Sequence, residues 1–329
     1  MQTPDTNLTP DTILIFEKPE AYFFPHYHGI VFAPFGVPQP GIRYLAYKVL
    51  HLLHLPGTHL FWGSWKIPAR TARRVVIFDY GYQRGMERYI RRINPDCQVY
   101  LFFWNKVNPY NKGHLRFSDA AAVFSTDPED CAKYGLKYNH IFYPRDYYTP
   151  DITASDIDTS NISTSENCPA LQHRLFFLGT DKGRVPYIAS LKHVLEESGL
   201  LCDIRVVTSA KVPSYQEQYR EILTSARLSY NEYLVQLRSC NVLLDITQEG
   251  QSALTMRVME AVYLSKKLIT NNRHVLTYDF YDPDNIFILP ENSFPAPDEI
   301  QRFLHTPFRP YPDTVLDHYS FEHWLQAFT

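Results

Sequence analysis

Short apolar runs alternate with amphipathic stretches along most of the chain. In the first half, four runs are rich in β-branched and aromatic residues, at 12–16, 74–80, 98–104 and 121–126. Runs of this length without strict alternation are typical of strands that are buried on both faces. Helix-like stretches at 41–55, 84–93 and 127–134 fall between them. Strands alternating with helices predict a parallel sheet that is covered on both sides.

The same alternation returns after a polar interruption at 151–170, which consists largely of Ser, Thr, Asp and Asn and predicts an exposed linker. Strands are expected at 174–180, 203–209, 241–247 and 267–272, with helices at 185–198, about 230–239 and about 252–264. In the tail YSFEHWLQAF, apolar residues recur with a helical period. This second series predicts another open α/β sheet.

The chain is therefore expected to be α/β, with two doubly wound, Rossmann-like domains. The predicted division is an N-terminal acceptor-side domain at 1–150, a linker at 151–171, a second domain at 172–307, and a C-terminal helix within 308–329 that packs back on the first domain. Ligands of such domains bind at the carboxyl ends of the strands, so the loops that follow strands are the places to search for chemistry.

Composition agrees with a folded protein of two domains. The chain has 329 residues, of which 45% are apolar and 20% are charged, and a domain holds roughly 150 residues. The cysteines are scattered, without CxxC spacing: Cys97, Cys131, Cys168, Cys202 and Cys240. A disulfide framework or a zinc site is therefore not expected. The polar N-terminus lacks the features of a secretory signal, which predicts a cytoplasmic protein.

Charge is unevenly distributed along the chain. Residues 41–92 contain ten Lys and Arg and two acids, whereas residues 275–329 contain two Arg and nine acids. This asymmetry suggests either domains that attract each other or a face that meets an anionic partner. Nucleic-acid binding is not expected, because the pI is near 6.5 and no recognition motif accompanies the basic segment.

The loop after the strand at 174–180 is a candidate phosphate site. Gly179, Thr180 and Gly183 let the backbone turn closely, and a helix is expected to begin near residue 185. A helix N-terminus presents free N–H groups, and Lys182 and Arg184 add positive charge, so the loop suits a diphosphate. The alternative is a glycine turn with solvated charges.

A second candidate is DITQEGQSALTMRVMEA, at 245–261. Gly250, Gln251 and Ser252 are expected where a helix begins, so their N–H groups would be capped or bound to an anion. Arg257 and Glu260 are three residues apart and share a helix face. A carboxylate in this position could accept the hydroxyls of a ribose. The alternative is an ion pair on a solvated face.

The motif GTDKGR, followed by YNEYLVQLRSCNVLLDITQEGQSALTMRVMEAVYLSKKLITNN, resembles the donor-binding half of GT-B glycosyltransferases, especially those of bacterial lipopolysaccharide or capsular polysaccharide synthesis. The match covers roughly 172–275, and STDPEDCAKYGLKYNHIFYP at 125–144 resembles the end of the first domain of such enzymes. The resemblance implies the GT-B architecture, in which two Rossmann-like domains face a cleft. It also implies a nucleotide-sugar donor, and a glycan or lipid-linked acceptor.

By position, the resemblance makes Glu260 the ribose-binding acid, Gly250 to Ser252 the phosphate loop, and Lys182 or Arg184 the stabilisers of the leaving group. One departure is clear. The acid-x7-acid pair of many retaining members would need an acid at 252, where this chain has Ser252, and Glu249 is out of register. The stereochemical outcome is therefore left open.

No metal and no cofactor are expected at the donor site. The departing nucleoside diphosphate carries negative charge that fixed cations and helix dipoles can neutralise, and Lys182, Arg184 and Arg257 supply the cations. Two DxD sequences occur, but the one at 156–158 falls in the linker and the one at 282–284 in an acidic late loop. Neither is expected to hold a metal.

A catalytic base, if the reaction inverts, is expected in the N-terminal domain. The candidates are His26 and His28 in FFPHYHG and Asp79 at the end of RVVIFDY, since an imidazole or a carboxylate can take a hydroxyl proton. For the histidines the alternative is a packing role. They do not make a metal site, because no third ligand is recognisable.

The segment at 41–74 mixes aromatic, aliphatic and basic residues and contains no acid. Such a face could lie on the inner, anionic face of a membrane, or it could be an amphipathic helix on the sheet followed by a basic loop. The sequence thus predicts a glycosyltransferase of surface polysaccharide synthesis. The alternatives are a nucleotide-sugar epimerase or hydrolase, and a non-catalytic sugar-nucleotide or glycan-binding assembly partner.

Overall fold

The computed structural model describes residues 11–18, 31–37, 41–117, 119–144, 173–208, 217–248 and 250–328. The chain divides into two compact units. The first contains Met1–His140 together with Trp324–Thr329, and the second contains Ile141–His323. The end of the chain therefore belongs to the unit in which the chain begins, while the expected linker at 151–171 lies outside the described residues.

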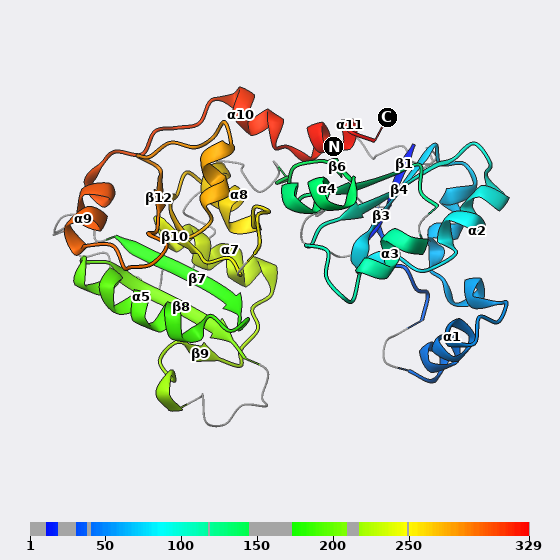
Figure 1. Ribbon diagram of the computed structural model, residues 1–329, viewed down its shortest axis with the longest axis horizontal. Helices are drawn as coiled ribbons and strands as arrows, with labels where there is room; N and C mark the ends of the chain where they lie inside the picture. The colour runs from blue at the N-terminus through cyan, green and yellow to red at the C-terminus, as the bar shows by residue number, and fades with distance from the viewer. Residues whose placement is uncertain are drawn as a thin grey trace, which may run out of the picture. The chain divides into compact units, whose positions relative to one another are not determined.

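The first unit is built on a six-stranded sheet of order β2-β1-β3-β4-β5-β6, in which all neighbouring strands are parallel. Its strands are β1 (Thr12–Ile15), β2 (Val31–Phe32), β3 (Arg74–Phe78), β4 (Gln98–Phe103), β5 (Ala122–Ser125) and β6 (Lys137–Tyr138). Its α-helices are α1 (Ile42–Leu52), α2 (Met86–Ile93), α3 (Lys112–Phe117) and α4 (Pro128–Tyr134), seen in Figure 1. The 3₁₀ helices are η1 (Thr58–Phe61), η2 (Ser64–Lys66), η3 (Pro68–Arg70) and η4 (Asp79–Gly81).

Both faces of this sheet are buried, as the continuous apolar runs predict. On β3, Val75 and Ile77 point into a cluster that also holds Trp65 and Met86. Phe78 points to the opposite face, where its ring lies 5.7 Å from that of Trp324. The last residues of the chain thus complete the core of the first unit, and burial of such large aromatic side chains is a major stabilising contribution.

Local signals fix the ends of α4, the helix that leads out of β5. Asp127 is its N-cap and accepts a hydrogen bond from the backbone N–H of Asp130 at 3.0 Å. Pro128 stands in the first turn, and Gly135 ends the helix with a left-handed φ of 66°. A side-chain acceptor, an early proline and a terminal glycine are the features that begin and end a helix.

The second unit has a six-stranded sheet of order β12-β11-β10-β7-β8-β9, again with parallel neighbours throughout. Its strands are β7 (Arg174–Thr180), β8 (Leu201–Val207), β9 (Leu223–Thr224), β10 (Val242–Asp245), β11 (Lys267–Thr270) and β12 (Ile286–Ile288). Its helices are α5 (Val185–Glu197), α7 (Tyr230–Ser239), α8 (Met256–Tyr263), η8 (Arg273–Thr277), α9 (Pro297–His305) and α10 (Asp313–His318). From there, α11 (Phe321–Gln326) carries the chain back into the first unit.

The core of the second unit lies between α5 and the sheet. Leu175 and Phe177 of β7 pack with Ile188 and Leu191 of α5, and all four side chains are buried. In Figure 1, α5 runs along β7 and β8. The predicted doubly wound α/β fold is confirmed in each unit by an all-parallel sheet with crossover helices.

Two predicted details are wrong. The helix expected from about 252 begins at Met256, because Thr255 adopts extended backbone and stands at its N-cap. The strand expected to continue to 80 ends at Phe78, because Asp79 enters the turn η4. Several short or polar elements were not predicted: β2, β6, β9, β12, α3, α9 and α10. No helix in the described residues is long and apolar enough to cross a membrane.

Candidate functional site

The strand order of the second unit places β7 and β10 side by side at the centre of the sheet. From β7 the chain proceeds outward to β8 and β9, and from β10 it proceeds outward in the other direction. The loops that follow two such strands leave the sheet on opposite sides and open a crevice at their carboxyl ends, where doubly wound folds bind ligands. Both sequence-predicted phosphate loops follow these two strands.

The loop after β7 turns closely into α5. Gly183 adopts a left-handed φ of 79°, and its N–H donates to Oδ1 of Asp181 at 2.9 Å. Arg184 is the N-cap residue of α5, with Pro186 in the first turn, and no side chain caps the helix. The first N–H groups of α5 therefore keep their capacity to bind an anion.

Arg184 and Arg257 bring two guanidinium groups to this edge of the sheet. Arg257 donates from Nη2 to the carbonyl of Leu178 at 2.5 Å and lies over the ring of Phe177, 4.6 Å from its centroid. Arg184 donates to the carbonyl of Thr180 at 2.9 Å and also to the carbonyl of Ile246. These contacts hold the two arginines at the ends of β7 and β10.

Both arginines keep an unused donor. The Nε atoms of Arg184 and Arg257 are buried and have no hydrogen-bond partner among the described residues. A buried N–H without a partner costs free energy, so native structures rarely leave one without a reason. Two such atoms at one edge of the sheet suit a ligand that supplies acceptor oxygens.

Lys182 adds a third cation. Partial burial, followed by the charges of Arg184 and Arg257, lowers the pKa of its ammonium group. The pKa of Arg184 is likewise lowered, by burial and then by Arg257. Lys182 stands two residues before Arg184 in the same loop, and an anionic ligand would relieve the repulsion among these cations. The structure thus brings together Lys182, Arg184 and Arg257 beside Gly179 and Thr180.

Asp245, which the sequence reasoning did not single out as a site residue, organises this region. It is fully buried at the end of β10 and pairs with Nη1 of Arg257 at 3.5 Å. It also accepts hydroxyl hydrogen bonds from Thr255 at 2.8 Å and Thr270 at 2.9 Å. The signal that could have identified Asp245 in the sequence is an acid at the carboxyl end of a buried central strand. Because its oxygens are occupied, Asp245 positions Arg257.

Glu260, the predicted ribose acid, is buried in α8. Its Oε2 accepts a hydrogen bond from the hydroxyl of Tyr233 at 2.6 Å, and burial raises the pKa of its carboxyl to about 7. Tyr233 lies on α7, and the sequence reasoning missed this partner, because 27 residues separate the two. The ribose-binding role of Glu260 stays a prediction.

The segment Gly250, Gln251 and Ser252 does not stand at a helix start, because α8 begins at Met256. Gly250 has a left-handed φ of 71°, and the N–H of Gln251 donates to the carbonyl of Gln248 at 3.2 Å. The three residues therefore form a turn after β10 rather than the first turn of α8. Their binding of phosphate stays a prediction, and Glu249 lies outside the described residues.

In the first unit, Asp79 is buried directly after β3. Its carboxylate accepts hydrogen bonds from the N–H of Trp104 at 3.2 Å and from the side-chain amides of Asn111 at 3.2 Å and Asn105 at 3.4 Å. Burial raises its pKa to about 6, although the hydrogen bonds oppose the shift. Asp79 therefore anchors the loop after β4, and its role as a base stays a prediction. His26 and His28 lie outside the described residues.

The DxD sequence at 282–284 has its own partners. Arg309 pairs with Asp284 at 2.5 Å and with Asp282 at 3.7 Å. Both carboxylates thus have an arginine as counter-charge, and the expectation that they hold no metal stays a prediction. Asp156 and Asp158 lie outside the described residues.

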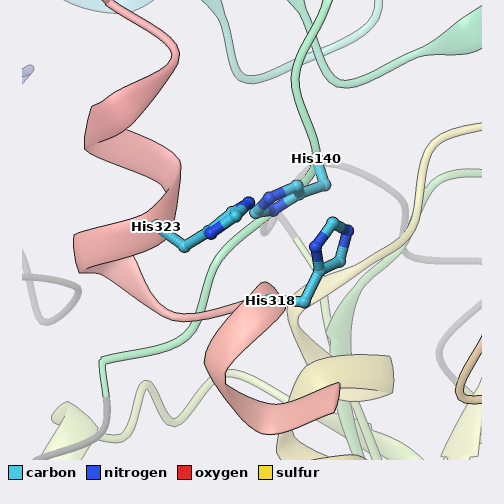
Figure 2. A group of neighbouring side chains, drawn as sticks. All are labelled: His140, His318 and His323. Atoms are coloured by element: carbon cyan, nitrogen blue, oxygen red, sulfur yellow. The ribbon is translucent and has the colours of Figure 1, made fainter. Parts of the chain in front are cut away.

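Three histidines that the sequence reasoning did not single out form a group that could hold a metal ion. Figure 2 shows His140, His318 and His323, and their ligand nitrogens all lie within 4.8 Å of one another. Three imidazoles are a ligand set that Zn²⁺ accepts. Their separation along the chain gives no spacing motif. The expected absence of a metal concerns the donor loops and stays a prediction.

Each unit of the chain is thus an open, parallel α/β unit, and the second unit carries Arg184 and Arg257 at the carboxyl ends of its central strands. A scan of protein-family models and a search of curated proteins gave no match. Among solved structures, a glycosyltransferase from Rickettsia africae shares 8% identity over 91% of this chain and 83% of its own, with a TM-score of 0.48. CalG4, the calicheamicin glycosyltransferase, shares 9% identity over 93% of this chain and 80% of its own, with a TM-score of 0.30. The likeness is loose, and the fold rests on the sheets themselves.

Proposed function

We propose that the protein is a glycosyltransferase, which moves a sugar from a nucleotide-sugar donor to a glycan or lipid-linked acceptor in bacterial surface polysaccharide synthesis. The observation that carries the proposal is the meeting of Lys182, Arg184 and Arg257 at the carboxyl ends of β7 and β10. Two of these cations have buried Nε atoms without a partner. Such a site suits the diphosphate of a nucleotide-sugar.

The chemistry of transfer explains why cations are needed here. The bond between the anomeric carbon and the diphosphate oxygen breaks, a bond from the acceptor oxygen forms, and the acceptor hydroxyl loses its proton. Negative charge grows on the departing diphosphate, and fixed cations that are already in place stabilise it without reorganisation. Lys182 and Arg184 take this role in the proposal, without a bound metal.

The remaining donor contacts follow the sequence prediction. Gly179 and Thr180, with Gly250, Gln251 and Ser252, would give backbone contacts to the phosphates, and Glu260 would accept the ribose hydroxyls. Gly179 supports close approach, because a Cβ added there would lie 3.0 Å from Nη2 of Arg257 and 2.9 Å from the ring of Phe177. The position therefore has no room for a side chain while Arg257 holds its place.

The acceptor side is proposed for the first unit, with Asp79, His26 or His28 as the base. An acid with a pKa of about 6 is suited to take a proton near neutral pH. The protein is proposed to act in the cytoplasm and to touch the inner face of a membrane through residues 41–74, where a lipid-linked acceptor would be found. No nucleic acid is proposed as a partner.

Thermal denaturation with UDP, GDP, ADP and CDP tests the donor site. A nucleoside diphosphate at 100 times its Kd stabilises the native state by about 2.7 kcal/mol, which raises Tm by roughly 5 °C or more in a unit of this size. We expect one nucleotide to give this shift, and we expect Lys182→Gln and Glu260→Gln to reduce it.

Arg227→Gln is the matched control, because Arg227 is an exposed cation of the same unit. It should leave the shift unchanged. Loss of the shift in the control, or no shift with any nucleotide in the unaltered protein, would contradict the proposal. Incubation with nucleotide-sugars then separates the alternatives: hydrolysis or epimerisation without an acceptor indicates the other enzymes, and binding without turnover indicates the assembly partner.

A further inference from the structure

The helix α1 carries an exposed apolar stripe. Ile42, Leu45, Val49 and Leu52 recur at intervals of three, four and three residues, so they lie along one side of the helix. Their exposed fractions are 84%, 60%, 47% and 76%. Single exposed apolar residues are common, but a continuous stripe on one helix marks an interaction surface.

The opposite side of α1 attaches the helix to the rest of the first unit. Tyr47 is buried, its ring lies 4.7 Å from that of Phe35, and its hydroxyl donates to Oε1 of Gln83. Tyr44 also packs on Phe35, with the ring centroids 5.3 Å apart. The aromatic side of α1 therefore faces the protein and its aliphatic side faces outward, so the alternative of an ordinary amphipathic helix covering the sheet does not hold.

Exposed aliphatic side chains are also found beyond the helix. Further exposed aliphatic side chains follow in the same segment, at Leu53, Leu55, Leu60 and Ile67. In Figure 1, α1 stands apart from the strands of the first sheet. We term the stripe, together with these four exposed side chains, the α1 surface.

The charged residues within the segment that carries the α1 surface have one sign. Lys48 is exposed on one flank of the stripe, Arg43 is exposed in the first turn of the helix, and Arg70 and Arg73 are exposed further along. No acid occurs from residue 21 to residue 78. A basic helix with an aliphatic face is the pattern of helices that lie in the interface of an anionic bilayer, with the cations at the level of the lipid phosphates.

We propose that α1 lies in the interface of an anionic lipid bilayer, with Ile42, Leu45, Val49 and Leu52 inserted among the lipids and Arg43 and Lys48 on the headgroup phosphates. Charge complementarity selects this partner. Two copies of the chain joined through α1 would bring the same cations together, whereas anionic headgroups neutralise them. The inference deepens the membrane contact of the proposed function, but its test requires neither nucleotide nor sugar transfer.

Co-sedimentation with vesicles tests the inference. The intact protein should bind vesicles of phosphatidylcholine mixed with phosphatidylglycerol, and bind vesicles of phosphatidylcholine alone at least about tenfold more weakly, since each cation near an anionic surface contributes about fivefold. The triple variant Leu45→Gln/Val49→Gln/Leu52→Gln should weaken binding by about a hundredfold or more, because each inserted side chain contributes about tenfold. The side chains are exposed, so Tm should stay unchanged.

Matched variants in the second unit control for general effects of polarity and charge. Leu201→Gln/Val235→Gln replaces two exposed aliphatic residues, and Arg227→Gln/Arg302→Gln removes two exposed cations; both should bind vesicles as the intact protein does. Arg43→Gln/Lys48→Gln should weaken binding to the anionic vesicles by roughly twentyfold.

Equal binding to both vesicle types, or undiminished binding of the triple variant, would overturn the inference. A dimer that the triple variant abolishes, in a protein that binds no vesicles, would overturn it as well and would assign the α1 surface to a second copy. Nucleotide-induced thermal shifts should be the same in the triple variant and the intact protein, which separates this inference from the proposed function.

Discussion

Two buried aspartates occupy similar places in the two sheets and are stabilised in different ways. Asp79 comes directly after β3, and Asp245 ends β10. Asp245 pairs with Arg257, whereas the described hydrogen-bond donors to Asp79 are neutral N–H groups of Tyr80, Trp104, Asn105 and Asn111. Neutral donors do not fully offset burial, so the pKa of Asp79 rises to about 6. The carboxyl edge of the first sheet thus holds a carboxylate that titrates near pH 6, and the carboxyl edge of the second sheet holds a cluster of cations.

The difference suits the two roles that the proposed function assigns to the two units. A buried acid with a raised pKa can exchange a proton near neutral pH. A buried acid beside an arginine remains a fixed anion, and it holds that arginine in place at the end of the strand. Acceptor activation is therefore proposed for the first unit and leaving-group stabilisation for the second.

Removal of Asp245, the carboxylate that pairs with Arg257, should have the largest effect on the unfolding free energy. Asp245→Ala leaves Arg257 as a buried cation without its counter-charge and two hydroxyls without their acceptor, which should cost about 3–5 kcal/mol of unfolding free energy. Urea denaturation followed by far-ultraviolet circular dichroism measures it. Asp203→Ala, which breaks the half-exposed pair with Arg205, should cost less than about 1 kcal/mol. Equal losses in the two variants would show that Arg257 does not depend on Asp245.

Substitution of Asp79 should have a smaller effect on the unfolding free energy, and this effect should depend on pH. The folded-state pKa of Asp79, about 6, lies above its ordinary value of 3.8, so the folded state binds the proton more tightly. Its contribution to stability is present below about pH 4 and is lost as the pH rises to about 6, with a change of about 3 kcal/mol. Asp79→Asn cannot titrate, and its difference from the unaltered protein should shift by this amount across the window.

Tryptophan fluorescence isolates this measurement. All four tryptophans, Trp62, Trp65, Trp104 and Trp324, belong to the first unit, so their signal follows the unfolding of the unit that contains Asp79. A difference that stays constant between pH 4 and pH 6 would mean that Asp79 has its ordinary pKa. The base hypothesis is tested separately, because Asp79→Asn should then keep nucleotide binding and lose transfer.

The alternation of strands and helices could be predicted because parallel strands buried on both faces leave long apolar runs in the sequence. Short edge strands leave no such signal. β6 has two residues, Lys137 and Tyr138, both exposed, and its place depends on pairing with β5. The start of α8 was wrong by about four residues, because apolar Ala253 and Leu254 precede Thr255 and extend the helical pattern into a loop.

At the candidate site, the sequence located the loops and not their internal partners. That Lys182, Arg184 and Arg257 follow or adjoin the ends of central strands could be predicted, because the order of strands and helices is visible in the sequence; their binding of phosphate stays a prediction. The pair formed by Glu260 and Tyr233 could not, because it joins α8 to α7 through tertiary packing. Spacing along one helix shows which residues share a face, but it does not show what that face meets.

The smallest effect on stability is expected at Gly179, where the consequence for binding should be larger. In Gly179→Ala, the new methyl group would meet the guanidinium of Arg257 and the ring edge of Phe177. The ring of Phe177 is fixed in the core, whereas the partly exposed Arg257 can shift, so the unfolding free energy should fall by about 1–2 kcal/mol. Arg257 would then leave the face of Phe177, and the affinity for a nucleoside diphosphate should fall at least about tenfold, because one charge-assisted contact contributes about 1.5–3 kcal/mol. Isothermal titration calorimetry measures the affinity, with Ser190→Ala on the exposed side of α5 as the control. Unchanged affinity in Gly179→Ala would show that the position of Arg257 over Phe177 does not matter for the ligand. The proposed role of Arg257 in the second unit, with which Asp79 is compared, would then be wrong.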